Sequence, residues 1–348
     1  MSPDLRKGMV SPREVADSAV EQPTRSVRRV SLRAIARRAQ AVVLTPGVPL
    51  LLAFGAMLGY FTIQLPYFMT QPNMISVLQF SSPTFILAAG FTIVMIGGGI
   101  DLSVGAGSVL AALVAGFLAL DGLPPAVALF CGMLVGVASG LANGLLVTRA
   151  RINPLIATLG MLYVLEAIGY RLTGGLNQQV YDRQFLIMQA RWFGTPAPIY
   201  VAGGVLVLTW ILLRMTKLGA HIYALGGNAE AARQCAFNVE HYRLGLYALG
   251  GLYAGLGGIV TASLTGNLAP LAGLGVLFAI CTAVFLGGVS LTGGRGSIVG
   301  ALIGVLFIGA LNNGLVQDMA NPEISTVIQG VLLIIAVAVD QRPQGGYR

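Results

Sequence analysis

Hydroxyl and amide side chains inside long apolar runs are the groups of this chain best suited to chemistry. Such groups can hydrogen-bond a neutral, hydroxylated solute such as a sugar, whereas an amino acid or a phosphate would favour a buried cation or a helix N-terminus. Any one of them could instead hydrogen-bond a neighbouring helix, so the prediction rests on the set. The candidates for a solute path are Gln79, Ser81, Ser82, Thr84, Ser139, Asn143, Asn312 and Asn313.

Pro83 stands among the first of these residues and predicts a break in its helix, because proline lacks an N–H and its ring collides with the preceding turn. A break would free backbone carbonyls at membrane depth, where they are tolerated only beside protein or a water-filled cavity. The sequence therefore predicts an interrupted helix beside the solute path.

Two acidic residues complete the candidate path. Asp101, with Ser103 two residues later, either closes an inner gate by its charge or caps the helix that follows. Glu166 falls near the middle of an apolar run, where an ionised carboxylate costs about 2.5 to 3.5 kcal/mol. Arg171 is five residues further on and so lies on a different face of the helix. Glu166 is then protonated, paired with another helix, or part of the path.

One polar interruption, from Leu213 to Tyr242, separates the apolar runs. Its two glycines, at 226 and 227, predict a turn, and Asn228 predicts the N-cap of a short helix. Such a helix would lie outside the membrane, where a soluble partner can bind it. The candidate contact residues are Gly227, Asn228, Glu230, Ala231, Ala232 and Arg233.

Residues for other chemistries are missing. A phosphate-binding P-loop needs a lysine after its glycines, and the lysines of this chain, Lys7 and Lys217, follow no such loop. His221 and His241 share the polar interruption, where we expect them to solvate its surface. The three cysteines have no CxxC or ligand spacing. We therefore expect no catalytic site, metal site or cofactor in this chain.

Composition predicts a membrane protein. Hydrophobic residues make up 55% of the chain and charged residues 10%, against roughly 25% charged residues in soluble domains. Apolar runs of about 20 residues cross a bilayer as helices, so we expect an all-α polytopic membrane protein. Its ten predicted spans are 48–66, 73–97, 101–120, 124–148, 153–173, 196–214, 244–265, 275–291, 297–316 and 324–341.

Basic residues set the predicted orientation. Residues 1–40 form an Arg-rich tail, which we expect to be disordered and cytoplasmic. The loops with most of the later arginines then also face the cytoplasm, as do both termini. The transmembrane domain covers 41–341, with a cytoplasmic loop at 214–243, and a short tail covers 342–348. No basic face alternates with aromatic residues, so nucleic acid is not an expected partner.

Two glycine-rich turns look alike. Leu102–Val109, after Gly97–Gly99, resembles Leu291–Ile298, after Gly287–Gly288. In the predicted topology both lie at the cytoplasmic end of an even-numbered span, so a parallel structural repeat is one explanation. Chance recurrence of glycine turns in membrane proteins is the other.

Five stretches resemble, in order, the signatures of the ribose-type monosaccharide permeases of bacterial ABC importers. Together they extend over about residues 48–341, and five in register are far more specific than one. They are Gly97–Gly105 (GGGIDLSVG), Ile152–Met161 (INPLIATLGM), Ala224–Arg233 (ALGGNAEAAR), Leu286–Gly294 (LGGVSLTGG) and Leu311–Leu315 (LNNGL).

The resemblance implies a type II importer permease of about ten spans in the bacterial inner membrane. It implies a second permease subunit, cytoplasmic ATPase subunits that use ATP and Mg²⁺, and a periplasmic substrate-binding protein. It also implies that the short helix after Asn228 docks in a groove of the ATPase. The chain departs from the family pattern at Cys235–Val239, which bears on the choice of ATPase, and at Glu166–Ala167. A further departure at Val276–Ala279 leaves open the contacts at the outer end of the eighth span and the particular sugar.

Two alternatives remain at this point. A branched-chain amino acid ABC permease is the nearest rival, and the GGIDLS-type signature favours a sugar over it. An ion-coupled secondary transporter would need a chain of intramembrane acids or histidines, for which Glu166 alone is a poor candidate.

Overall fold

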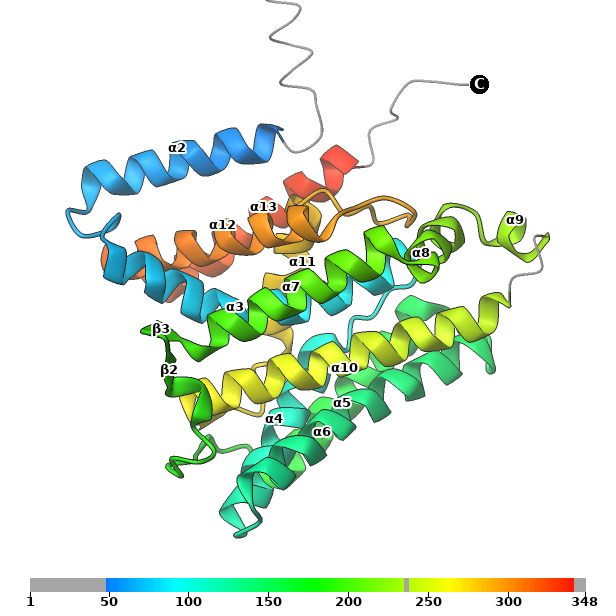
Figure 1. Ribbon diagram of the computed structural model, residues 1–348, viewed down its shortest axis with the longest axis horizontal. Coiled ribbons are helices and arrows are strands. Elements are labelled where there is room, and N and C mark those ends of the chain that lie inside the picture. Colours follow the sequence, from blue (N-terminus) through cyan, green and yellow to red (C-terminus); the bar gives the residue numbers. More distant parts are fainter. Residues whose placement is uncertain (1–47, 235–237, 341–348) are drawn as a thin grey trace, which may run out of the picture. The chain divides into compact units, whose positions relative to one another are not determined.

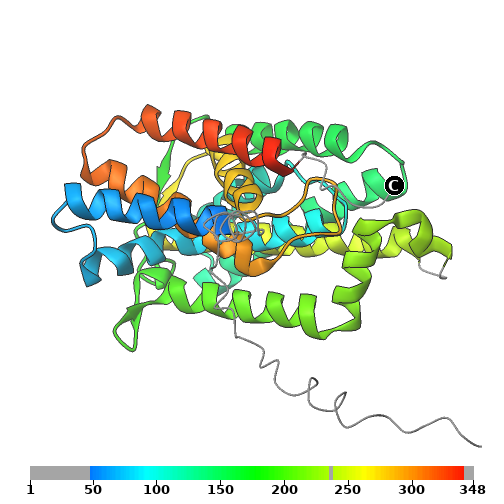
Figure 2. The same cartoon turned by 90° about the horizontal axis from the view of Figure 1, so that it is seen from above.

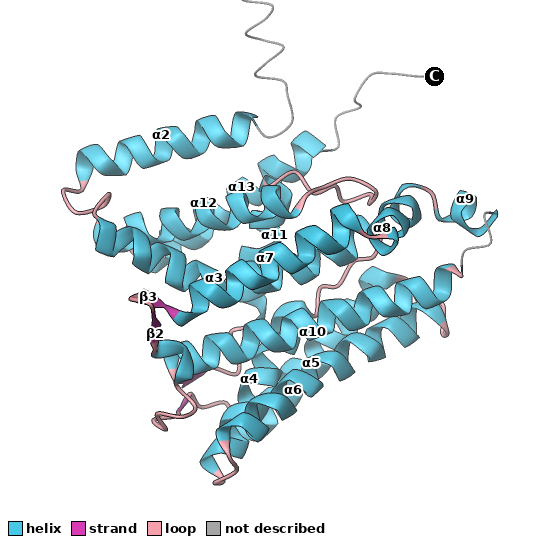
Figure 3. Ribbon diagram, viewed as in Figure 1, coloured by secondary structure: helices cyan, strands magenta, loops and turns pink. Residues whose placement is uncertain are grey.

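The computed structural model describes residues 48–234 and 238–340. Helices dominate this part of the chain, and its strands are two residues long (Figure 1, Figure 3). The predicted tails at 1–40 and 342–348 lie outside the described residues. The helices are α2 (Val48–Gln64), α3 (Gln71–Ile96), α4 (Val104–Leu120), α5 (Pro125–Thr148), α6 (Pro154–Thr173), α7 (Ala197–Met215), α8 (Lys217–Gly227), α9 (Ala229–Gln234), α10 (Val239–Thr265), α11 (Gly273–Leu286), α12 (Ile298–Gln317) and α13 (Pro322–Asp340). The remaining elements are β1 (Gln178–Gln179), the 3₁₀-helix η1 (Ile187–Gln189), β2 (Arg191–Trp192), β3 (Thr195–Pro196) and β4 (Asn267–Leu268).

Each predicted span overlaps one helix, so the described chain is all-α and polytopic as predicted, although the eighth predicted span, 275–291, extends past the end of α11 at Leu286. Among the described residues, seven helices are long and apolar enough to cross a membrane: α3, α5, α6, α7, α10, α12 and α13. The apolar helices α2, α4 and α11 are shorter, with 17, 17 and 14 residues. The start of α10 moves from 244 to Val239, because Asn238 caps the helix by accepting the N–H of His241.

Helix α10 packs against α5 through small residues. A Cβ built on Gly136 would lie 2.5 Å from the carbonyl oxygen of Gly251, and one built on Gly140 would lie 2.2 Å from that of Tyr247. Only glycine permits such close backbone approach, which is how helices gain packing contacts in lipid. The pair therefore forms a rigid unit, with α3 and α4 also packed against α10.

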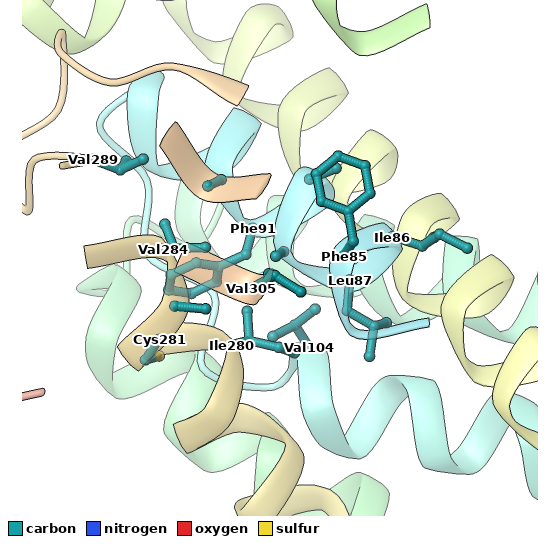
Figure 4. Close-up of a cluster of buried hydrophobic side chains, with 14 of the residues drawn as sticks. Phe85, Ile86, Leu87, Phe91, Val104, Ile280, Cys281, Val284, Val289 and Val305 are labelled. Carbon is teal, nitrogen blue, oxygen red and sulfur yellow. The ribbon is translucent and has the colours of Figure 1, made fainter. Parts of the chain in front are cut away.

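Helix α3 joins this unit to the rest of the bundle. It contacts α10 on one side and α7, α11 and α12 on others. Its residues from Phe85 to Ile96 are all buried, and Figure 4 shows Phe85 and Phe91 among side chains from the neighbouring helices, including Ile280 and Val305. In Figure 2, α7 (green) and α13 (red) lie on opposite sides of this group. Helix α3 therefore links the α5–α10 unit to α7, α11 and α12.

The predicted break at Pro83 is wrong, since α3 is one continuous helix from Gln71 to Ile96. Proline still removes one N–H donor from the helix. Neighbouring helices and hydroxyl side chains can compensate for that loss in a membrane protein. Here the carbonyl without its helical donor is that of Gln79, four residues before Pro83, and Pro83 itself is buried among the neighbouring helices. The bundle packed around α3 therefore keeps the helix intact through the proline.

Connections between the helices gather at two ends of the bundle. At one end, β1 pairs with β4 and so joins the α6–α7 and α10–α11 connections. At the other, α8 lies against the turns after α3 and α11, and α9 follows α8 (Figure 1). We call this second end the α9 end. Asp340, the last residue of α13, also lies there, because it accepts hydrogen bonds from the Ser290 hydroxyl and the Leu291 N–H at 3.0 and 3.1 Å.

Candidate functional site

Two short helices, α8 and α9, form the polar interruption. Asn228 separates them, and its side-chain Oδ1 accepts the N–H groups of Glu230 and Ala231, each at 3.0 Å. This is the N-cap that the sequence predicts. Arg233 contacts Glu230 at 3.4 Å on the exposed surface of α9. Of the six candidate contact residues, Ala232 is buried and the other five are exposed, so α9 offers an open polar face.

The predicted turn at Gly226 and Gly227 is wrong, because both residues end helix α8. Glycine is a poor helix former, which hid this helix from the sequence. Thr216 caps its start by accepting the N–H of Gly219 at 3.1 Å. His221 hydrogen-bonds the hydroxyl of Tyr242 at 2.8 Å, so it ties α8 to α10 rather than only solvating the surface.

Four glycines explain why α8 ends as it does. They bring α8 against the turns that follow α3 and α11. We call these residues, Gly98, Gly226, Gly293 and Gly294, the glycine junction. A Cβ on Gly226 would lie 1.8 Å from the carbonyl oxygen of Ile96 and 2.5 Å from the nitrogen of Gly294. The Gly294 N–H donates to that same Ile96 carbonyl at 2.8 Å. The three segments are therefore in backbone contact.

A tyrosine reinforces the junction. The Tyr223 hydroxyl of α8 donates to the carbonyl of Gly296 at 2.9 Å. Burial raises the pKa of the Tyr223 phenol, so the hydroxyl remains a proton donor at neutral pH. Movement of α8 must then carry the α11–α12 connection with it or break this bond.

The two turns of the glycine junction share one hydrogen-bond pattern. Each ends its helix with three successive N–H groups that donate four, three and five residues back along the chain. The same pattern also ends α4 and α12, so it is a common helix C-terminus and does not distinguish a repeat from chance recurrence. The donors are Gly97, Gly98 and Gly99 after α3, and Gly287, Gly288 and Val289 after α11.

Asp101 forms a buried cluster with Ser103 and Asn143. Its Oδ1 accepts the Ser103 N–H at 2.9 Å, the Ser103 hydroxyl at 2.7 Å and the Asn143 amide at 3.2 Å. Asn143 also donates to the Ser103 hydroxyl at 2.7 Å. Asp101 is 3% exposed and Asn143 is fully buried. These bonds hold Asp101 in the turn before α4 and fasten that turn to α5, but its side chain accepts no N–H group of α4 itself.

A cavity of about 350 Å³ lies between α3, α11 and α12. Its size falls at the lower end of the range for small-molecule sites. Hydroxyl and amide side chains line it alongside apolar ones, and the lining contains no ionisable side chain. The polar members are Ser76, Ser81, Thr84, Asn312 and Asn313.

Ser81 is the most informative residue of this cavity. Its hydroxyl is buried and has no hydrogen-bond partner among the described residues. Ser81 also lines a second, mostly apolar cavity between α3, α7 and α12, together with Ser82. A buried hydroxyl without a partner costs free energy, and a solute hydroxyl in either cavity would supply the missing partner.

The two asparagines of α12 belong to separate amide networks. Asn313 exchanges hydrogen bonds with Asn73 of α3 at 2.9 and 3.0 Å, and Gln317 donates to it at 2.9 Å. Asn312 accepts from Gln329 of α13 at 3.1 Å and from the Ser325 hydroxyl. These networks hold α12 between α3 and α13 and fix which amide edges face the cavity.

The remaining predicted path residues lie elsewhere. Gln79 lines neither cavity. Ser139 donates to the carbonyl of Gly136 in its own helix at 2.7 Å. Glu166 faces the start of α11, since a Cβ on Gly273 would lie 2.9 Å from its Oε1. The positive end of the α11 dipole favours a carboxylate there, so Glu166 has a structural reason for its place.

The structure thus divides the predicted path into groups. Ser82, Asn312 and Asn313 line the cavities beside α3, together with Ser81 and Thr84. Asp101, Ser103 and Asn143 come together in a different, solid cluster. Sequence reasoning missed the partners that orient the asparagines. These partners are Asn73, Gln317, Ser325 and Gln329, and the signal for Gln329 was a lone amide in the apolar run at 324–341. Ser76, which lines the cavity, was also missed.

The family model and the curated relatives that match this chain are all transport permeases. A family model described as "Branched-chain amino acid transport system / permease component" matches residues 73–337. The chain is 36% identical over 287 residues to the ribose import permease protein of Escherichia coli (strain K12), covering 80% of this chain and 88% of the relative. It is 36% identical to the ribose import permease protein of Bacillus subtilis (strain 168), covering 83% and 92%, and 35% identical to the fructose import permease protein of Rhizobium meliloti, covering 84% and 82%. No solved structure matches the chain.

Proposed function

The chain belongs to the family of branched-chain amino acid transport system permease components, and from this premise we propose that it is the membrane subunit of an ABC importer for a monosaccharide. Relatives at 35–36% identity are named ribose and fructose import permeases. The observation that carries the substrate class is the cavity between α3, α11 and α12, whose polar lining is hydroxyl and amide. These groups suit a neutral polyol, whereas an amino acid would leave its ammonium and carboxylate without ionic partners.

In this proposal, separate ATPase subunits hydrolyse ATP with Mg²⁺ and press on α9. Support comes from the exposed, capped form of α9 and from its backbone connection through α8 to the glycine junction. Force applied to Asn228–Arg233 would reach the ends of α3 and α11 as a rigid-body displacement. A second permease subunit and a periplasmic binding protein complete the importer.

The proposed orientation places the α9 end in the cytoplasm of a bacterium, with both termini inside. The basic residues of the polar interruption and of the α5–α6 connection lie at this end, including Arg151, Arg233 and Arg243, which line a common pocket. Such a concentration of arginine is the mark of a cytoplasmic face. Labelling of an engineered cysteine in α9 from outside intact cells would contradict the orientation.

Transport by the reconstituted importer tests the substrate class. We expect uptake of a radiolabelled monosaccharide such as ribose or fructose into vesicles that hold ATP, and no competition by leucine or isoleucine. Uptake of a branched-chain amino acid with no uptake of any monosaccharide would refute the proposal.

Substitution of Ser81 tests the cavity. Ser81→Ala removes a buried hydroxyl that has no partner, so the protein itself should be as stable as before or more stable. Transport should nevertheless weaken about three- to tenfold, the effect of one lost hydrogen bond. Ser108→Ala is the matched control, because the Ser108 hydroxyl donates to Gly105 in its own helix at 2.7 Å. Equal transport by the Ser81→Ala variant and wild type would remove Ser81 from the path.

A further inference from the structure

A cavity distinct from the two beside α3 opens at the α9 end, between the α5–α6 connection and the start of α10. It is polar and has a volume of about 530 Å³. Three arginines line it: Arg151, Arg233 and Arg243. Among the described residues of the lining, Glu240 is the one acid. The cavity therefore has an excess of positive charge, which the transport mechanism described above does not use.

Two of these arginines have no carboxylate partner within the part of the chain that the structure describes. The salt bridge recorded there joins Arg233 to Glu230, on the exposed surface of α9. The Nε of Arg243 is buried and has no hydrogen-bond acceptor among those residues. A buried guanidinium donor without an acceptor is costly, and an anion in the cavity would supply the acceptor.

Local backbone geometry supports an anion at the same place. Val239 and Glu240, the first residues of α10, also line the cavity, so the positive end of a 27-residue helix faces it.

The surface beside the cavity identifies the kind of anion. Ile152 and Pro154 line the cavity itself, and the first turn of α6 continues from them with exposed apolar side chains. Ile152, Leu155 and Ile156 are 38%, 45% and 64% exposed. A site for a soluble anion would not need an apolar surface next to it, whereas a phospholipid has a phosphate and acyl chains in that arrangement. Basic pockets at the ends of membrane helices bind anionic lipid headgroups.

We propose that this cavity binds the phosphate of an anionic phospholipid, such as phosphatidylglycerol or cardiolipin, whose acyl chains lie along the start of α6. Arg151 and Arg243 contact the phosphate, and Arg233 connects the headgroup to α9. The lipid would then be a bound component on the surface that the ATPase is proposed to contact. The site is independent of the identity of the transported solute.

Native mass spectrometry of the full chain in detergent tests the site, with phosphatidylglycerol, cardiolipin and phosphatidylcholine as separate probes. Wild type should retain the two anionic lipids and lose phosphatidylcholine. The double variant Arg151→Gln, Arg243→Gln should bind phosphatidylglycerol roughly 30-fold more weakly, the effect of two arginine contacts. Arg149→Gln is the matched control, because Arg149 is exposed, lies two residues from Arg151 and does not line the cavity.

A second variant distinguishes loss of the lipid site from misfolding of the protein. Glu240→Gln removes the acid of the cavity and should tighten phosphatidylglycerol binding several-fold, a gain that an unfolded protein cannot mimic. Unchanged lipid retention by the double variant would overturn the proposal. So would displacement of phosphatidylglycerol by inorganic phosphate at equal concentration, which would indicate a soluble-anion site. Loss of ATPase capture by the double variant with lipid retention intact would assign the cavity to a protein partner and would also overturn it.

Discussion

Gly226→Ala is the substitution whose effect the structure defines most sharply. The added methyl group would lie 1.8 Å from the carbonyl oxygen of Ile96 and 2.5 Å from the nitrogen of Gly294. Both neighbours are backbone atoms, so no side chain can rotate away to make room. The end of α8 must therefore move off the turns after α3 and α11.

The free-energy cost follows from three effects. Overpacking of a tight contact costs about 1 to 3 kcal/mol. Separation of the segments also breaks the bond from the Gly294 N–H to Ile96, recorded at 2.8 Å, which costs about 1 to 3 kcal/mol if the groups stay buried. Alanine gains about 1 kcal/mol over glycine inside a helix. The net effect is roughly 1 to 5 kcal/mol against the closed junction, which shifts the equilibrium toward the separated arrangement by about fivefold or more.

Two measurements check this reasoning: thermal unfolding of the permease in detergent, and solute-stimulated ATP hydrolysis by the reconstituted importer. The variant should insert into the membrane but lose most of its stimulated hydrolysis, because α9 no longer moves with α3. Gly245→Ala is the control, since Gly245 also lies in a helix at this end and a Cβ there would meet nothing within 4 Å. Wild-type stability together with wild-type coupling in the Gly226→Ala variant would refute the role of the glycine junction.

Other substitutions give further expected outcomes. Glu230→Arg with Arg233→Glu reverses both charges on α9 and should abolish coupled ATP hydrolysis while the protein remains in the membrane; undiminished hydrolysis would exclude α9 as the contact. Asp101→Asn keeps an oxygen that can accept the three hydrogen bonds of the buried cluster and should retain transport, whereas Asp101→Ala should lose about 1 to 3 kcal/mol or more of stability; transport abolished equally by both would favour a charge-based gate. Tyr247→Phe removes the 3.0 Å bond to the Ile100 carbonyl and should lower the unfolding free energy by about 1 kcal/mol, as a thermal-shift assay can measure.

The spans could be predicted from sequence because they depend on a property summed over many residues. About twenty apolar side chains cross a bilayer wherever they pack, so every predicted span appears as a helix. The cap at Asn228 could also be predicted, because its side chain accepts N–H groups only two and three residues further along the chain. Helix α8 was not predicted, because its glycines lower the helix propensity of the segment. The same glycines permit its close contact with distant turns.

The grouping of polar residues could not be predicted, since it depends on contacts between distant parts of the chain. Asn73 and Asn313 are 240 positions apart and exchange both of their amide hydrogen bonds. In a helix that is apolar on every side, such as α3, the sequence gives no face on which Ser81 and Gln79 should differ. Their different roles become visible only when α11 and α12 are placed beside α3.

Helix α3 contains both a residue of the proposed solute cavity and a residue of the glycine junction. Ser81 faces the cavities, and Ile96, fifteen residues along the same helix, accepts the hydrogen bond of the glycine junction. The two are about 22 Å apart at the rise of an α-helix, and every residue between Phe85 and Ile96 is buried. A buried, continuous helix cannot absorb a displacement by bending into empty space. A shift imposed on α8 therefore reaches the serine hydroxyl without a separate relay, provided that α3 stays unbroken at Pro83, as the structure has it.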